Sequence, residues 1–147
     1  MENLRVILIK MHDSMVELEA ILTEEMNQLG RPQINPVSLQ IISDTKSRLL
    51  STIGYYDEMR SQEEHRLNLA APYENHEAFA TLWKNITHHV KTSNQLNKQI
   101  ATLLEMHMQK ANDLKNMVNE VDNRASTYGV DGISRQAASG KIYNISI

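Results

Sequence analysis

Residues 79–124 have the sequence FATLWKNITHHVKTSNQLNKQIATLLEMHMQKANDLKNMVNEVDNR, without a proline or a glycine. Apolar residues fill most positions of a row that advances alternately by three and four residues, which is the spacing of one face of a coiled-coil helix. We therefore expect a helix from about Asn75 to Ser126, about 75 Å long at about 1.5 Å per residue. The row consists of Phe79, Leu82, Ile86, His89, Ser93, Leu96, Ile100, Leu103, His107, Lys110, Leu114, Met117, Val121 and Arg124.

The first 30 residues predict a shorter helix with the same spacing. Gly30 is a natural residue to follow a helix, and Pro32 prevents the helix from continuing. Because the connector 30–35 is short, the next helix should return antiparallel to the first. The apolar row of this first helix is Leu4, Leu8, Met11, Met15, Leu18, Leu22, Met26 and Leu29.

A second helix is predicted to begin at Pro36, with Asn35 as its N-cap. Gly54 inside it costs about 1 kcal/mol relative to alanine; close backbone contact and simple tolerance both explain it. The row turns polar in its later half, so we expect weak burial there. Asn75 is a candidate cap for the third helix. The second row is Leu39, Ile42, Lys46, Leu49, Ile53, Tyr56, Arg60, Glu63 and Leu67.

These elements predict an all-α fold. It is an antiparallel helical hairpin with a long third helix, a coiled-coil-like bundle over residues 1–127, followed by a flexible C-terminal tail over 128–147. The alternative is four helices, since the poor helix formers at 87–93 favour a break. Net charge is −4 over residues 1–30 and +2 over 91–147, a contrast that favours a first helix antiparallel to the third.

The chain lacks the residue constellations of known catalytic and metal sites. It has no cysteine, and none of its six histidines forms an i, i+4 pair. Glu24-Glu25 and Glu63-Glu64 are interpreted as solvated charges rather than acid–base pairs. A net charge of −3 gives no basis for nucleic-acid or anionic-membrane binding. We expect no cofactor and no metal.

Neither a secretory signal nor a membrane span is predicted. The apolar run at the N-terminus is too short for a signal, and no segment approaches the ~20 apolar residues that cross a bilayer. A soluble, intracellular chain is expected.

The length mismatch between the helices points to a function. Helices of roughly 40–45 Å cannot cover one of about 75 Å, so the third should overhang by several turns. Exposed apolar stripes of this kind mark partner sites, and methionine-rich ones repack around different helices. The alternative is that self-association, or folding back at 87–93, covers the stripe. The overhang is expected to carry Leu103, Leu104, Met106, Met108, Leu114, Met117, Val118 and Val121.

Several segments, in this order, resemble the FlgN family of flagellar type III export chaperones. They are KSRLL at 46–50, LNKQIATLL at 96–104, YGVDG at 128–132 and KIYNISI at 141–147. The resemblance covers nearly the whole chain and contains no catalytic signature.

The resemblance implies a cytoplasmic chaperone, not an enzyme. Such a chaperone binds the C-terminal helices of the hook–filament junction proteins FlgK and FlgL, prevents their premature assembly and delivers them to the export-gate protein FlhA, with the export ATPase FliI as a further partner. It implicates Tyr128 in docking to FlhA. The alternative function is a self-associating coiled-coil module, and a homodimer is expected when no client is bound. The expected client-binding residues are Leu103, Leu104, Met108, Leu114, Met117, Val118 and Val121.

Overall fold

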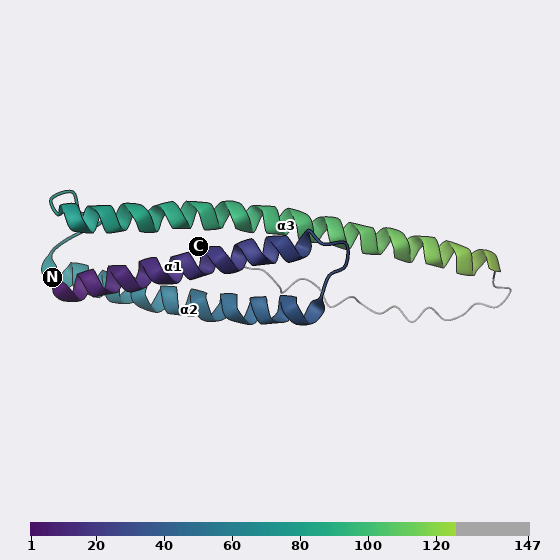
Figure 1. Cartoon of the computed structure of the whole chain (residues 1–147), viewed down its shortest axis with the longest axis horizontal. Helices are drawn as coiled ribbons and strands as arrows, with labels where there is room; N and C mark the ends of the chain where they lie inside the picture. Colours follow the sequence, from purple (N-terminus) through teal and green to yellow (C-terminus); the bar gives the residue numbers. More distant parts are fainter. Residues whose placement is uncertain (126–147) are drawn as a thin grey trace.

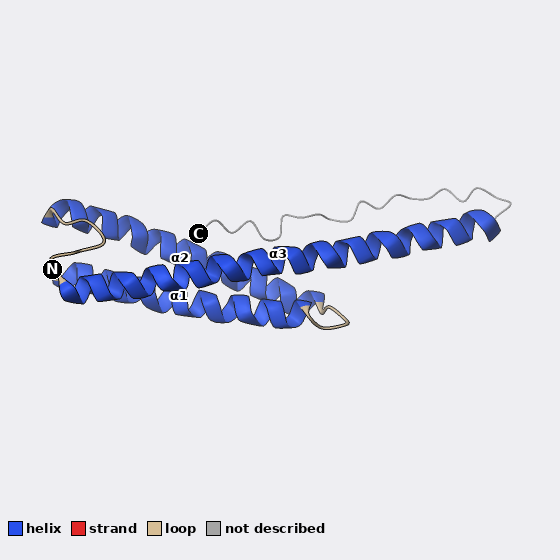
Figure 2. Ribbon diagram, turned by 90° about the horizontal axis from the view of Figure 1, so that it is seen from above, coloured by secondary structure: helices blue, strands red, loops and turns tan. Residues whose placement is uncertain are grey.

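The computed structural model describes residues 1–125, which form three helices and no strand. They are α1 (Glu2–Leu29), α2 (Pro36–Leu67) and α3 (Glu77–Ala125) (Figure 1). The 49 residues of α3 run without a break through 87–93 (Figure 2), so the three-helix prediction is confirmed and the four-helix alternative is not. Among these helices, none is long and apolar enough to cross a membrane.

The ends of the helices follow partly from the predicted capping residues. The Asn35 side chain accepts hydrogen bonds from the backbone N–H groups of Val37 (3.0 Å) and Ser38 (3.3 Å), which satisfies donors that a helix N-terminus leaves free. Gly30 follows α1 with φ −78°, in the right-handed region. It does not adopt the left-handed conformation that glycine commonly adopts after a helix. Asn75 does not cap α3: the helix begins at Glu77, and the carbonyl of His76 accepts the Ala80 N–H at 2.8 Å.

α1 is the central helix of the bundle. It packs closely on both α2 and α3, whereas no Cα atom of α2 lies within 8 Å of one in α3. The contact between Glu25 and Lys46 shows that α1 and α2 are antiparallel. The contacts of His89 with Glu19 and of His107 with Leu29 show that α1 and α3 are parallel. The prediction of an antiparallel α1 and α3 from charge is therefore wrong, because two short connectors reverse the chain twice.

The core lies along α1, as the spacing predicts. Every apolar position in the predicted α1 row is buried except Met26, which is half-buried, and Ile7 joins them. In α2 the later part of the row is only half-buried, which confirms the expected weak packing there. The buried members contributed by α2, the connector and α3 are Ile42, Leu49, Tyr73, Phe79, Ile86 and Ile100.

An ion pair is buried within the α1–α2 hairpin. Lys46 Nζ lies 2.7 Å from Glu25 Oε1, and the two side chains are 4% and 0% exposed. Burial lowers the pKa of the Lys46 ammonium, and the hydrogen bond and charge of Glu25 oppose this shift. Glu25 is therefore not the solvated charge expected from the sequence.

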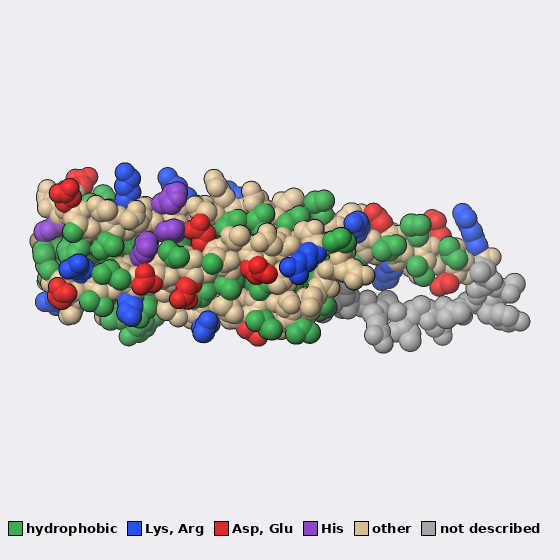
Figure 3. All heavy atoms as spheres, viewed as in Figure 1, with side chains coloured by type: hydrophobic (Ala, Val, Ile, Leu, Met, Phe, Trp, Pro, Cys, Tyr) green, Lys and Arg blue, Asp and Glu red, His purple; other side chains and the backbone are tan. Residues whose placement is uncertain are grey.

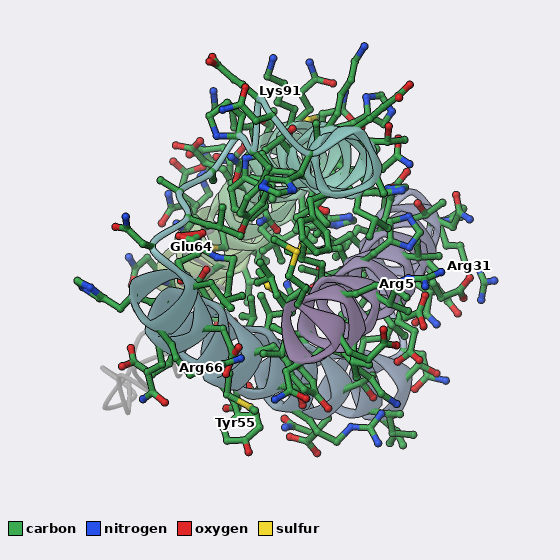
Figure 4. The ribbon with its side chains drawn as sticks, turned by 90° about the vertical axis from the view of Figure 1, so that its left-hand side faces the viewer. Arg5, Arg31, Tyr55, Glu64, Arg66 and Lys91 are labelled. Carbon is green, nitrogen blue, oxygen red and sulfur yellow. The ribbon has the colours of Figure 1, made fainter. Side chains whose placement is uncertain are left out.

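A polar and aromatic cluster joins the end of α2 to the start of α3. The Tyr73 hydroxyl donates to Glu64 at 2.7 Å, and Arg60 pairs with Glu64 while its guanidinium lies 4.8 Å above the Trp83 ring. Burial raises the pKa of Tyr73, and the bond to Glu64 adds to this shift. Glu64 lies on the side of α2 that faces the connector, whereas Tyr55 points away from the bundle (Figure 4). Glu64, like Glu25, is therefore not the solvated charge expected from the sequence, because it binds Tyr73 and Arg60.

Candidate functional site: the overhang of α3

α3 passes the tip of the α1–α2 hairpin near His107. The His107 Nε2–H donates to the carbonyl oxygen of Leu29, the last residue of α1, at 2.6 Å. From Met108 to Arg124 every residue of α3 is exposed, and we call residues 108–124 the overhang. At about 1.5 Å per residue it extends about 25 Å beyond the hairpin (Figure 1). The predicted mismatch in helix length is confirmed.

The structure divides the seven predicted client-binding residues into two groups. Leu103 and Leu104 are half-buried and pack against the core, so they belong to the edge of the bundle. The other five lie on the overhang, with exposed fractions from 55% for Met108 to 63% for Met117. These five, which we call the overhang stripe, are Met108, Leu114, Met117, Val118 and Val121.

Apart from Met108, which projects from another side of the helix, the overhang stripe continues the face of α3 that α1 covers inside the bundle. Leu114, Met117 and Val121 follow Ile86 and Ile100 in the same row of three- and four-residue steps. Ile86 and Ile100 are 2% and 1% exposed because α1 lies against them. Beyond Leu29, no other part of residues 1–125 covers this face. The apolar face of α3 is therefore longer than α1, the helix that covers it.

Charges of both signs lie within the row of the stripe and on either side of it. Lys110, Lys115 and Arg124 alternate with acidic residues, and Gln109 bonds to Asp113 at 3.1 Å. Figure 3 shows apolar and charged side chains interspersed at this end of the molecule. A surface of mixed charge gives no long-range steering toward a ligand of one sign. The overhang therefore presents mainly apolar side chains for contact.

A hollow of about 530 Å³ marks the place where the hairpin ends against α3. Leu29 and Pro32 line it from the hairpin, and Leu103, Met106 and Lys110 line it from α3. Met106 is 61% exposed.

Two predicted features fall outside residues 1–125. Tyr128 and the predicted tail at 128–147 are not among the residues that the structure describes. Within the described residues, no group of three or more histidine, cysteine, aspartate or glutamate side chains is placed to hold a metal ion. His89, which lies in the apolar row of α3, bonds to Glu19. Its ring packs edge-on against the His12 ring, with the ring centroids 5.2 Å apart.

The fold defines a class of protein, an all-helical bundle whose last helix carries an exposed apolar face. The family model described as FlgN protein matches residues 1–136. Flagella synthesis protein FlgN of Salmonella typhimurium is 30% identical over 132 residues, which is 90% of each chain. Its counterpart of Yersinia enterocolitica is 28% identical over 121 residues (82% of each chain), and that of Escherichia coli K12 is 26% identical over 132 residues (90% of each). No solved structure matches the chain.

The chain belongs to the FlgN family. Because the curated relatives are named flagella synthesis proteins, this membership supports a role in flagellar biogenesis. The family is not known for enzymatic activity.

Proposed function

We propose that this protein is a cytoplasmic export chaperone that binds the C-terminal helices of FlgK and FlgL on the overhang of α3. The observation that carries the proposal is the overhang stripe, which continues a buried helix-binding face into solvent. The identity of the clients rests on the family resemblance. A subunit made for assembly carries apolar helices, and a chaperone that covers them prevents premature assembly.

The binding energy in this proposal comes from apolar burial. Burying apolar area contributes about 25 cal/mol per Å², from which the cost of ordering both helices is subtracted. Methionine side chains fit differently shaped partners because they are unbranched and flexible, which suits a site for two clients. Neither nucleotide nor metal is required for such a step.

A charge placed in the stripe tests the site. We expect Leu114→Asp or Val121→Asp to weaken binding of a FlgK C-terminal peptide at least about 100-fold, because a buried Leu or Val contributes about 1.5–3 kcal/mol and an unpaired carboxylate in the interface costs more. Isothermal titration calorimetry measures the loss. Circular dichroism should be unchanged, since both side chains are more than 60% exposed in the free chain.

Asn116→Asp is the matched control, because it adds the same charge at an exposed position on the opposite side of α3. We expect it to bind the peptide like the unchanged chain. If Leu114→Asp and Val121→Asp both bind as well as the control, the client site lies elsewhere.

Docking to the export gate is proposed to use a separate residue, Tyr128. We expect Tyr128→Ala to retain client binding and to lose binding to FlhA in a pull-down of the client-loaded chaperone. The two steps are separable because Tyr128 follows the overhang stripe in sequence and is not one of its residues. Retention of both interactions would refute this division of roles.

A further inference from the structure

A second apolar concavity lies between α2 and α3, on the part of the bundle away from the overhang. It is a groove of about 620 Å³ that exists because α2 and α3 each pack on α1, with no Cα atom of one within 8 Å of a Cα atom of the other. Met11 and Met15 of α1 form its floor. The walls consist of Leu50, Ile53, Gly54 and Asp57 from α2 and of Trp83, Ile86, Thr87 and Val90 from α3. We call it the α2–α3 groove.

The polar groups at the groove are already paired, so its surface is available mainly for apolar contact. Asp57 is the charged residue of the lining, and its Oδ1 accepts from Arg60 Nε at 3.0 Å. Arg60 also lies over the Trp83 ring, and Tyr73 contacts that ring edge-on with centroids 5.9 Å apart. This cluster closes the groove at the end near the α2–α3 connector. A helix lying in the groove must therefore extend toward the overhang.

Gly54 leaves a gap in the α2 wall that no part of residues 1–125 fills. A Cβ atom at this position would meet nothing within 4 Å, so contact within the described chain does not explain the glycine. Glycine in a helix interior costs about 1 kcal/mol relative to alanine. Space beside an uncovered helix backbone suits a large apolar side chain of a second molecule.

One row of α3 connects the groove to the overhang. Every seventh residue from Trp83 to Val118 occupies the same heptad position, so these residues lie on one slowly turning strip of the helix. Trp83 and Val90 lie in the groove, and Val118 lies on the overhang. This strip is about 52 Å long from Trp83 to Val118 at about 1.5 Å per residue. Its members are Trp83, Val90, Asn97, Leu104, Ala111 and Val118.

We propose that the α2–α3 groove binds the continuation of the same client helix that covers the overhang, so that the bound bundle has four helices beside Trp83. The inference rests on the proposed function and extends its site from residues 108–124 back to Trp83. The occupant is an amphipathic helix of about 40 residues with apolar side chains at three- and four-residue spacing, and one large apolar side chain opposite Gly54.

Filling the gap at Gly54 tests the proposal. Gly54→Leu places a branched side chain in the groove, and Gly54→Ala is the matched control, since both replacements favour the helix but alanine adds only one methyl group. The probes are two FlgK C-terminal peptides, one of about 40 residues and one of about 20 residues that spans only the overhang. We expect Gly54→Leu to bind the long peptide about tenfold more weakly than Gly54→Ala, with equal binding of the short peptide.

Trp83 provides a direct readout because it is the single tryptophan of the chain and lines the groove. With tryptophan-free peptides, the long peptide should shift the Trp83 emission to shorter wavelength, and the short peptide should not. Equal binding of the long peptide by both Gly54 variants, or no emission shift, overturns the proposal. A shift that depends on protein concentration without peptide also overturns it, because the groove would then hold a second copy.

These outcomes are distinct from failure of the proposed function. Leu114→Asp should abolish binding of both peptides. If it does, while Gly54→Leu has no effect, the client binds the overhang alone. If Leu114→Asp leaves both peptides bound, the overhang site itself is wrong.

Discussion

Glu25 and Lys46 are charged residues in positions that the core would otherwise fill with apolar side chains. The spacing places Lys46 correctly on the inner face of α2, but no feature of the sequence indicates that Glu25 opposes it. Within residues 1–125, Glu25 Oε2 has no hydrogen-bond partner. Burying the pair removes two charges from water, and this desolvation offsets much of their attraction. The pair therefore contributes more to the specific alignment of α1 with α2 than to stability. We interpret it as fixing the register of the hairpin.

Removing one member of this pair should be more harmful than removing both. We expect Lys46→Met to lower the free energy of unfolding by about 3–5 kcal/mol, because it leaves the Glu25 carboxylate buried and unpaired. The double variant Glu25→Leu/Lys46→Met should recover most of this loss. Urea denaturation followed by circular dichroism measures both, and Lys10→Met on the exposed side of α1 is the control. A double variant as unstable as Lys46→Met would show that the pair is not coupled.

α3 combines two environments in one helix. Its first half is held by α1, and the overhang has only its own hydrogen bonds and local side-chain pairs such as Gln109 with Asp113. Isolated helices shorter than about 12–15 residues are marginal in water, and most helix stability in proteins comes from packing. The overhang is therefore the part of α3 with the least tertiary support.

Amide hydrogen exchange should report this difference along α3. We expect residues 108–124 of the free chain to exchange at least about 100-fold faster than the amides near Ile86 and Ile100, which are buried against α1. A saturating client peptide should slow the exchange of residues 108–124 and leave that of α1 unchanged. Equal protection of both halves in the free chain at low concentration would mean that something already covers the overhang.

At the scale of the whole molecule, the exposed stripe allows two functions that the fold alone does not separate. One is the proposed chaperone, in which a client helix covers the stripe. The other is a self-associating module, in which a second copy does so. Both cover the same face of the overhang, so the partner with the higher affinity determines the function.

Light scattering with and without peptide separates the two. We expect the free chain to form at most a weak dimer whose mass rises with concentration, and a FlgK C-terminal peptide to convert it into a complex of defined mass. Leu114→Asp should keep the free chain monomeric, because it places a charge in the shared surface. A stable dimer whose mass does not change with peptide would support the self-associating module.

The helical segments, their hydrophobic faces and the expected excess length of the last segment can be predicted from the sequence alone. These features are local: they depend on spacing, capping and proline positions, which act within a few residues. The continuity of α3 through 87–93 needed the structure, because packing of Ile86 and Ile100 on α1 outweighs the weak helix formers between them.

Three features could not be predicted from the sequence: α1 lies at the centre and runs parallel to α3, Glu25 is buried against Lys46, and a groove separates α2 from α3. Each of these depends on which faces meet across long sequence separations. A helical pattern shows that a face is apolar; it does not show which helix covers it. The physical reason is that apolar contact is non-directional, so the length of the elements and the chain reversals between them select the partner.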